Sequence, residues 1–303
     1  MCLMLTEGLQ RHFPEAKQQH GKVTQAVLDK STRVWAVSLD NHEPVASKRL
    51  VLCSGSRPID TIPPNLRNNT GSQLANLDLD TALKPTLLAK TLDPNTPATI
   101  GVVGASHSAI LVLLNLYNLA ATSHPHLRIK WFSRHKELRY AKPMDGWILY
   151  DNTGLKGDAA QWARENLEEA TFHASPASQV ITKLFTGTGP GEQQVYQDQL
   201  PQCTHLVQAI GYQRDPLPLL SAVERAESEP LTLPINHDGI SGRFFATQDQ
   251  DSGSASFIPG LFGAGIAFPE RVTDPAGNVE HAVGFWKFMR FLQRVVPQWV
   301  EKP

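Results

Sequence analysis

A short segment rich in glycine and serine has the residue types of a phosphate-binding turn. Gly101 and Gly104 flank the apolar residues of a short strand. Ser106 and Ser108 follow, before the apolar stretch 110–119 that is typical of a buried helix. The start of such a helix presents unpaired N–H groups and a positive dipole end, which bind a pyrophosphate. Because the spacing departs from G-x-G-x-x-G, the segment by itself fits a dinucleotide site and an ordinary strand–helix unit about equally.

The next predicted strand, 127–132, ends beside a cation. Ser133 and Arg134 follow it directly, and Lys136 and Arg139 come soon after. In a dinucleotide-binding fold the end of this strand meets the adenosine ribose, where a cation accommodates the 2′-phosphate of NADP and an acid would favour NAD. The pattern therefore favours NADP, with Arg134 as the main contact. The alternative is a solvated basic loop.

The composition is ordinary for a globular protein and has no strong charge bias. Of the 303 residues, 41% are hydrophobic and 19% are charged, and the formal net charge is -1. This balance gives no electrostatic basis for binding nucleic acid or an anionic membrane. No stretch reaches the roughly 20 apolar residues of a membrane span, the first residues lack a signal-peptide core, and the three cysteines are widely spaced. We therefore expect a cytoplasmic protein without a metal site, since the histidines are scattered as well.

Hydrophobic patterning around the central segment predicts alternating strands and helices. Strands are predicted at 23–28, 33–39, 48–53, 100–103, 127–132 and 205–210, and hairpins are predicted for 180–183 with 195–197 and for 235–240 with 243–247. Helices are predicted near 80–90, 110–119, 158–170 and 279–295. This alternation predicts an α/β fold.

Three motifs, in their order along the chain, resemble those of the flavin-containing and N-hydroxylating monooxygenases within the pyridine nucleotide-disulfide oxidoreductase superfamily. LVLCSGSRP at 50–58 is similar to the strand and A-T-G motif of the family, and GVVGASHSA at 101–109 is similar to its NADPH-binding turn. HLVQAIGYQRDPLP at 205–218 is similar to its second A-T-G-Y motif. GLFGAGIAFPE at 260–270 resembles the late glycine turn that lies against the flavin in this family.

The resemblance implies that one domain is inserted in another. Residues 97–211 would form a Rossmann-like NAD(P)-binding domain within the remnant of an FAD-binding domain, 1–96 and 212–303. In the family, a separate G-x-G-x-x-G turn binds the FAD pyrophosphate, and this sequence has no such turn before Gly55. We therefore expect that FAD is not bound, that NADP binding is possible and that activity requires no cofactor.

Three hypotheses for the function follow. In the first, the vacated flavin cleft binds an apolar small molecule and catalyses a non-redox cyclisation or isomerisation. The second is an NADP(H)-dependent, flavin-assisted oxidoreductase or monooxygenase, and the third is a non-catalytic dinucleotide-binding protein, with a homodimer as one possibility. The candidate catalytic residues of the first hypothesis are Trp147, Tyr150, Asp151, Tyr212 and Glu270. The candidate cofactor-binding residues are Gly101, Gly104, Ser106, Ser108, Ser133 and Arg134.

Overall fold

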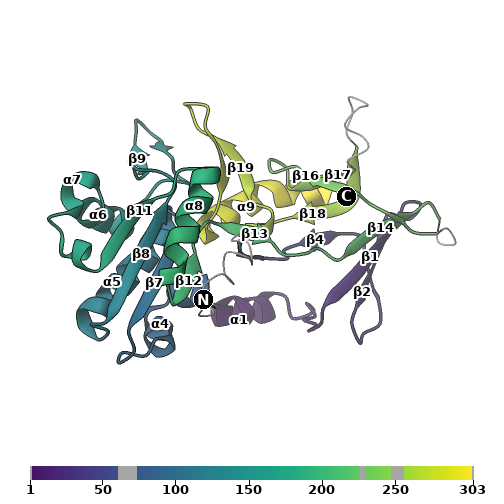
Figure 1. The fold of residues 1–303 in the computed structure, drawn as a ribbon. Coiled ribbons are helices and arrows are strands. Elements are labelled where there is room, and N and C mark those ends of the chain that lie inside the picture. Colours follow the sequence, from purple (N-terminus) through teal and green to yellow (C-terminus); the bar gives the residue numbers. More distant parts are fainter. Residues whose placement is uncertain (1, 61–73, 226–228, 247–255, 302–303) are drawn as a thin grey trace. The chain divides into compact units, whose positions relative to one another are not determined.

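A parallel sheet of five strands forms around the glycine-rich segment in the computed structural model, which describes residues 2–60, 74–225, 229–246 and 256–301 (Figure 1). Its strands are, in spatial order, β11 (Ile181–Phe185), β8 (Leu127–Ser133), β7 (Ala98–Val103), β12 (His205–Gln208) and β6 (Ala75–Asn76). All neighbouring pairs run parallel. The arrangement confirms the predicted α/β class with a Rossmann-like sheet.

The inner strands of this sheet are largely buried on both faces because helices cover each side. Ile100 and Val102 of β7 belong to the core beneath α5 (His107–Thr122), whereas Val103 belongs to the core beneath α8 (Pro190–Gln199). Figure 1 shows α5 and α8 on opposite sides of the sheet. Successive side chains of a strand point to opposite faces, so one apolar run supplies both cores.

Residues that precede the central strand pack with the same sheet. The predicted helix 80–90 is divided into α3 (Leu79–Ala82) and α4 (Pro85–Thr91), because Pro85 suits the first position of a helix and not its interior. Leu88 packs in the same core as α5, and β6 pairs with β12. This part of the chain therefore lies with the parallel sheet, upstream of the domain border predicted at residue 97.

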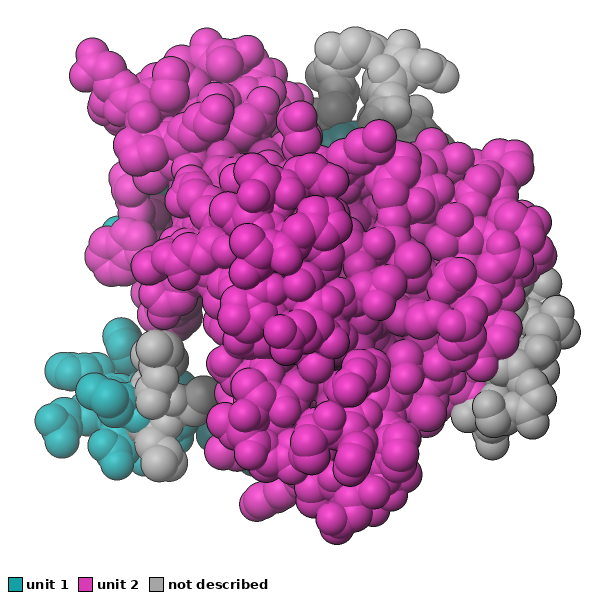
Figure 2. Space-filling view, turned by 60° about the vertical axis from the view of Figure 1, so that its left-hand side comes forward, with its two compact units in different colours: residues 1–53, 216–264, 292–303 teal, residues 54–215, 265–291 magenta. Residues whose placement is uncertain are grey.

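The chain divides into two compact units, which Figure 2 distinguishes by colour. Unit 1 consists of 1–53, 216–264 and 292–303, and unit 2 consists of 54–215 and 265–291. The segment 54–215 starts with β5 (Ser56–Pro58) and ends with β13 (Tyr212–Arg214). These two strands pair antiparallel, and Nη1 of Arg57 lies 3.0 Å from Oδ1 of Asp215.

Two hairpins and several helices complete unit 2. The hairpin β9 (Lys142–Pro143) with β10 (Ile148–Leu149) is followed by α6 (Gly157–Asn166) and α7 (Glu169–Phe172). The hairpin β19 (Glu270–Thr273) with β20 (Val279–Ala282) precedes α9 (Phe285–Glu301), of which residues 285–291 belong to unit 2 and the rest to unit 1. Within the described residues, no helix has both the length and the apolar character to cross a membrane.

Two further predicted elements differ from the structure. The helix predicted at 279–295 is wrong at its start, where β20 forms instead. Glu280 and Ala282 are buried and alternate with exposed residues, which is the period of a strand. The strand predicted at 195–197 lies in α8, which begins at Pro190, and the fixed φ of proline suits that position.

Unit 1 contains two β-sheets and the helix α1 (Cys2–His12). The first sheet has the order β15 (Leu231–Thr232), β14 (Leu219–Val223), β1 (Val23–Asp29), β2 (Val34–Leu39) and β3 (Val45–Ser47). The second has the order β16 (Ile235–His237), β17 (Arg243–Ala246), β18 (Phe257–Gly263) and β4 (Leu50–Leu52). β4 and β18 are parallel, so the strands of two motifs that resemble the flavin domain lie side by side.

Candidate functional site

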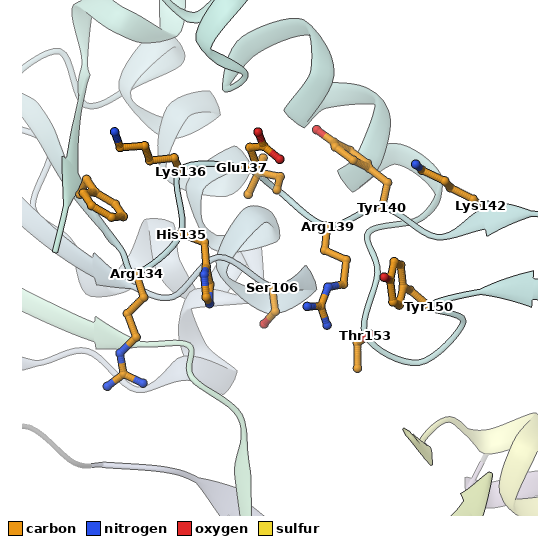
Figure 3. A pocket seen from close by; sticks show the side chains of 12 residues that line it. Ser106, Arg134, His135, Lys136, Glu137, Arg139, Tyr140, Lys142, Tyr150 and Thr153 are labelled. Atoms are coloured by element: carbon orange, nitrogen blue, oxygen red, sulfur yellow. The ribbon is translucent and has the colours of Figure 1, made fainter. Parts of the chain in front are cut away.

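A cavity of about 780 Å³ lies at the carboxyl end of the parallel sheet in unit 2 (Figure 3). Ser106 follows β7, Arg134 follows β8 and Phe185 ends β11. The carboxyl ends of parallel strands meet at one edge, where doubly wound sheets bind their ligands. The described lining residues are Ser106, Arg134, His135, Lys136, Glu137, Leu138, Arg139, Tyr140, Lys142, Tyr150, Thr153 and Phe185.

The start of α5 borders this cavity. Ser106 is the N-cap of α5, and its side chain makes no capping hydrogen bond. The N–H groups of the first turn, where Ser108 lies, therefore remain for an anion. Gly104 has a φ of +129°, and a Cβ at this position would collide with the backbone oxygen of Ala209. Only glycine lets the end of β7 approach the end of β12 so closely.

Arg134 is held by a carboxylate while much of its side chain stays accessible. Its Nε donates to Oε1 of Glu192 at 2.7 Å, and 55% of the side chain is exposed. The hydrogen bond to Glu192 raises the pKa of Arg134, so the guanidinium stays charged. Ser133 is buried, and its Oγ donates to the carbonyl of His135 at 2.6 Å. Ser133 thus shapes the turn that carries Arg134.

The side chains around the cavity are mainly basic. The basic lining residues are Arg134, His135, Lys136, Arg139 and Lys142, and Glu137 is the one carboxylate among the described lining residues. Figure 3 shows Arg134, His135 and Arg139 on the same side of the loop as Ser106, whereas Lys136 points the opposite way. This excess of positive charge suits a ligand that carries several phosphate groups.

Tyr150 and Thr153 form the side of the cavity across from Arg134 (Figure 3). Tyr150 has a φ of 57°, in the left-handed region that a tyrosine rarely adopts. The guanidinium of Arg139 lies 4.8 Å from the centroid of the Tyr150 ring, which is a cation–π contact. The tyrosine thus holds one of the cavity's cations in place.

Glu280 of β20 anchors the loop that carries these two residues. It accepts hydrogen bonds from the backbone N–H and the side-chain amide of Asn152 at 3.0 and 3.1 Å. A third hydrogen bond comes from Oγ1 of Thr153 at 2.5 Å. Burial by itself would raise the pKa of Glu280, but the hydrogen bonds from Thr153 and Asn152 outweigh burial and lower this pKa. The carboxylate is therefore charged at neutral pH and accepts these three hydrogen bonds in that state.

Lys287 of α9 fixes the same loop by a second set of bonds. Its Nζ donates to Oδ2 of Asp151 at 2.6 Å and to Oδ1 of Asn152 at 2.5 Å. Nζ of Lys156 lies 3.1 Å from Oδ1 of Asp151. Burial opposes ionisation of Asp151, but the hydrogen bonds from Lys287 and Lys156 lower its pKa. We call the contacts of Glu280 and Lys287 with residues 151–153 the 151–153 clamp.

The structure brings some of the predicted site residues together and separates others. Tyr150 lines the cavity with Ser106 and Arg134, whereas Asp151 is paired with two lysines. Trp147 lies in the turn of the β9–β10 hairpin, where its carbonyl accepts the N–H of Met144. It is not among the lining residues of the cavity.

Three other predicted residues also lie outside the cavity lining. The hydroxyl of Tyr212 donates to Oδ1 of Asp80 at 3.1 Å, and burial together with this bond raises the pKa of Tyr212 to about 12. Glu270 is the first residue of β19. Gly101 is buried inside β7, where a Cβ would lie 3.1 Å from Cδ1 of Leu206. Its place in the strand indicates close packing against β12.

The prediction from sequence did not include several residues that build this site. Lys142 lines the cavity, and Glu192 and Glu280 hold residues of its walls. The basic run after β8 is a usable signal for Lys142. The two glutamates carry no such signal, because each acts through a partner that is distant in sequence.

Comparisons with known proteins give one relative with high identity. No protein-family model matches the sequence. The chain is 48% identical over 307 residues to a protein named Monooxygenase AgnR1 from Paecilomyces divaricatus, and the match covers 99% of this chain and 73% of that protein.

Among solved structures the likeness is weaker. An FAD-dependent pyridine nucleotide-disulphide oxidoreductase from Desulfovibrio vulgaris matches with a TM-score of 0.46 and 12% identity, over 98% of this chain and 68% of the other. DfoA bound to FAD, a cadaverine monooxygenase from Erwinia amylovora, matches with a TM-score of 0.32 and 13% identity, over 93% of this chain and 56% of the other.

Proposed function

Because this chain belongs to the family of the monooxygenase from Paecilomyces divaricatus, we propose that unit 2 binds NADPH as the reductant for a flavin-dependent monooxygenation. One observation carries the proposal. A single basic cavity has the start of α5 at Ser106 and an accessible arginine, Arg134, at the end of the neighbouring strand. These are the two positions at which a Rossmann-like fold contacts the pyrophosphate and the 2′-phosphate of NADP.

The described residues fit NADPH at each of its charged groups. The first-turn N–H groups of α5 have no side-chain cap, so they are available to the pyrophosphate. Arg134 uses Nε for Glu192, which leaves its terminal nitrogens for the 2′-phosphate. Arg139, stacked on Tyr150, adds a further cation to the same cavity.

NADPH, when bound, supplies the hydride with which such a monooxygenase reduces its flavin. The residues of this cavity bind and orient the nucleotide and take no part in proton transfer in this proposal. Asp151, a candidate catalytic residue in the first hypothesis, is an anchor of the loop, since two lysines hold its carboxylate. Tyr150 contributes a wall of the cavity and the position of Arg139.

A flavin is the second requirement of the proposal. Ser54 and Gly265, which belong to two motifs that resemble the flavin domain of the family, are compatible with a bound flavin. Oγ of Ser54 is buried without a hydrogen-bond partner among the described residues, and the space next to Gly265, where a Cβ would stand, is open. A buried hydroxyl normally makes a hydrogen bond with a polar partner. The expectation that FAD is not bound stays a prediction. The non-redox cyclisation or isomerisation, which depends on that expectation, also stays a prediction.

The absorbance spectrum of the full-length protein separates these two alternatives. The protein is incubated with FAD and passed through a desalting column. A flavin spectrum that persists and is bleached by NADPH without oxygen supports the monooxygenase. A colourless protein that converts its substrate without NADPH or oxygen would instead support the cyclase or isomerase.

The NADPH half is tested by titration of the wild-type protein and two arginine variants with NADPH and NADH. We expect Arg134→Ala to weaken NADPH about 10- to 100-fold, because a charge-assisted bond contributes roughly 1.5–3 kcal/mol. The affinity of this variant for NADH should change little. Arg128→Ala, at the other end of β8, is the control and should resemble the wild type. Equal losses for the two nucleotides, or no binding by the wild type, would overturn the proposal.

A further inference from the structure

We infer that Glu192 is a positioning residue that aims Arg134 at a 2′-phosphate and thereby sets the preference for NADPH over NADH. The inference rests on the proposed NADPH site and extends it to a residue of another element, since Glu192 lies in the first turn of α8. Glu192 is not among the residues that line the cavity. Its effect on a nucleotide would therefore pass through Arg134.

The carboxylate of Glu192 is itself held firmly. Only 12% of its side chain is exposed. Its Oε1 accepts both Nε of Arg134 at 2.7 Å and the hydroxyl of Tyr196 at 3.1 Å. The ring of Tyr196 packs on that of Phe132, with ring centroids 5.5 Å apart, and Phe132 lies near the end of β8. Glu192 is thus tied to the strand from which Arg134 emerges.

This arrangement orders a side chain that would otherwise have many conformations. A long arginine side chain on an exposed loop loses rotamer freedom when it binds a ligand, and this loss reduces affinity. A bond at Nε fixes the guanidinium plane before the ligand arrives. The two terminal nitrogens can then make the paired bonds that suit a phosphate.

Glu192 also brings a negative charge close to the proposed phosphate position, which acts against binding. The two effects can be separated by substitution. Glu192→Ala removes both the hydrogen bond and the charge. Glu192→Gln keeps an oxygen that accepts from Nε but removes the charge. If positioning dominates, the alanine variant loses selectivity and the glutamine variant keeps it. If charge repulsion dominates, both variants bind the phosphate more tightly.

The test uses two small probes that differ only in the 2′-phosphate, adenosine 2′,5′-bisphosphate and adenosine 5′-monophosphate. Each is titrated by calorimetry into the full-length wild type and into the variants Glu192→Ala, Glu192→Gln and Asp198→Ala. Asp198 is an exposed acid on the same helix and serves as the control. We expect Glu192→Ala to weaken the bisphosphate about 2- to 10-fold, the range for one immobilised side chain, and to leave the monophosphate unchanged. Glu192→Gln and Asp198→Ala should remain close to the wild type.

The double variant Arg134→Ala with Glu192→Ala separates this inference from the proposed function. With Arg134 absent, removal of Glu192 should have no further effect on the bisphosphate. Three results would overturn the positioning role while the NADPH site stands. Glu192→Ala could weaken the bisphosphate as much in the Arg134→Ala background as in the wild type. Glu192→Ala alone could bind the bisphosphate more tightly, or it could lose the same affinity for both probes. If Arg134→Ala itself leaves the selectivity of the wild type intact, the proposed NADPH site fails, and the role of Glu192 fails with it.

Discussion

The strand-end side of the cavity, with Ser106 and Arg134, differs from the side with Tyr150 and Thr153 in what holds its residues in place. Ser106 and Arg134 follow β7 and β8, whose main chains are paired along their whole length. Thr153 depends on the side chain of Glu280, 127 residues further along the chain. The main chain of the first side is thus positioned by the pairing of strands, and the main chain of the second by a few side-chain bonds. Substitutions should therefore affect the two sides differently.

The largest difference is expected in stability. Glu280→Ala removes a buried, charged acceptor and leaves donors of Asn152 and Thr153 without it. We expect the free energy of unfolding to fall by about 2–4 kcal/mol, as for the loss of several bonds to a charged group. Arg134→Ala, on the strand-end side, should cost about 1 kcal/mol or less, because its side chain is largely exposed and Glu192, which loses this partner, keeps the hydrogen bond from Tyr196.

Urea unfolding followed by circular dichroism measures both variants. Glu280→Gln is the matched control, since it keeps the side-chain volume and one acceptor oxygen and should lose less stability than the alanine variant. The contrast between the two sides would be wrong if Arg134→Ala were as destabilising as Glu280→Ala. It would also be wrong if Glu280→Ala unfolded like the wild type.

A smaller effect is expected for Tyr150, where the two sides meet through Arg139. Tyr150→Ala removes the ring that supports this guanidinium. A cation–π contact at an exposed site contributes about 0.5–1 kcal/mol, so we expect NADPH binding to weaken about 2- to 5-fold. Tyr150→Phe keeps the ring and should bind like the wild type. Equal losses in the two variants, measured by fluorescence titration, would assign the effect to the hydroxyl instead.

The smallest effect is expected from mild acid. The pKa values of Glu280 and Asp151 lie below their ordinary values of 4.5 and 3.8. The folded state therefore binds fewer protons than the unfolded state at these groups. Their contribution to stability is present above the ordinary pKa values and is lost as the pH falls through the lowered ones.

Unfolding free energies between neutral pH and about pH 3 measure this loss. We expect a nearly constant value near neutral pH and a decline once the pH falls below about 4.5. Glu280→Gln should make the decline shallower, because one of the two carboxylates no longer titrates. A decline of unchanged steepness in this variant would mean that other groups cause the acid sensitivity.

The strand-end side could be predicted from the sequence because its signal is local. The apolar runs at 127–132 and 205–210 correspond to β8 and β12, and the residues that follow them must lie at one edge of the sheet. Arg134 could therefore be placed next to the cavity without knowledge of any distant contact. The basic side chains after it, including Arg139, were visible in the same stretch.

The sequence indicates Tyr150 and Asp151 on the other side, but the distant residues that anchor this loop could not be predicted, for two physical reasons. The pattern at 279–295 predicts an amphipathic helix for Glu280, and the short strand that it occupies forms only by pairing with β19. Lys287 and Asp151 are 136 residues apart, and no pattern in the sequence links them. The same limit applies to 195–197, where the apolar alternation of a short segment fits a strand or a helix, and the packing of Tyr196 decides.

The pairing of β5 with β13 brings the two ends of the segment 54–215 together. The segment 54–215 begins and ends in two strands that lie side by side, with the ion pair of Arg57 and Asp215 between them. Such a segment closes on itself, so a host chain can accept it at a single point without bridging a distance. The segment 54–215 therefore has the geometry of an insertion whose ends are joined by a ladder only three residues long, while residues 265–291 complete unit 2 from a later part of the chain.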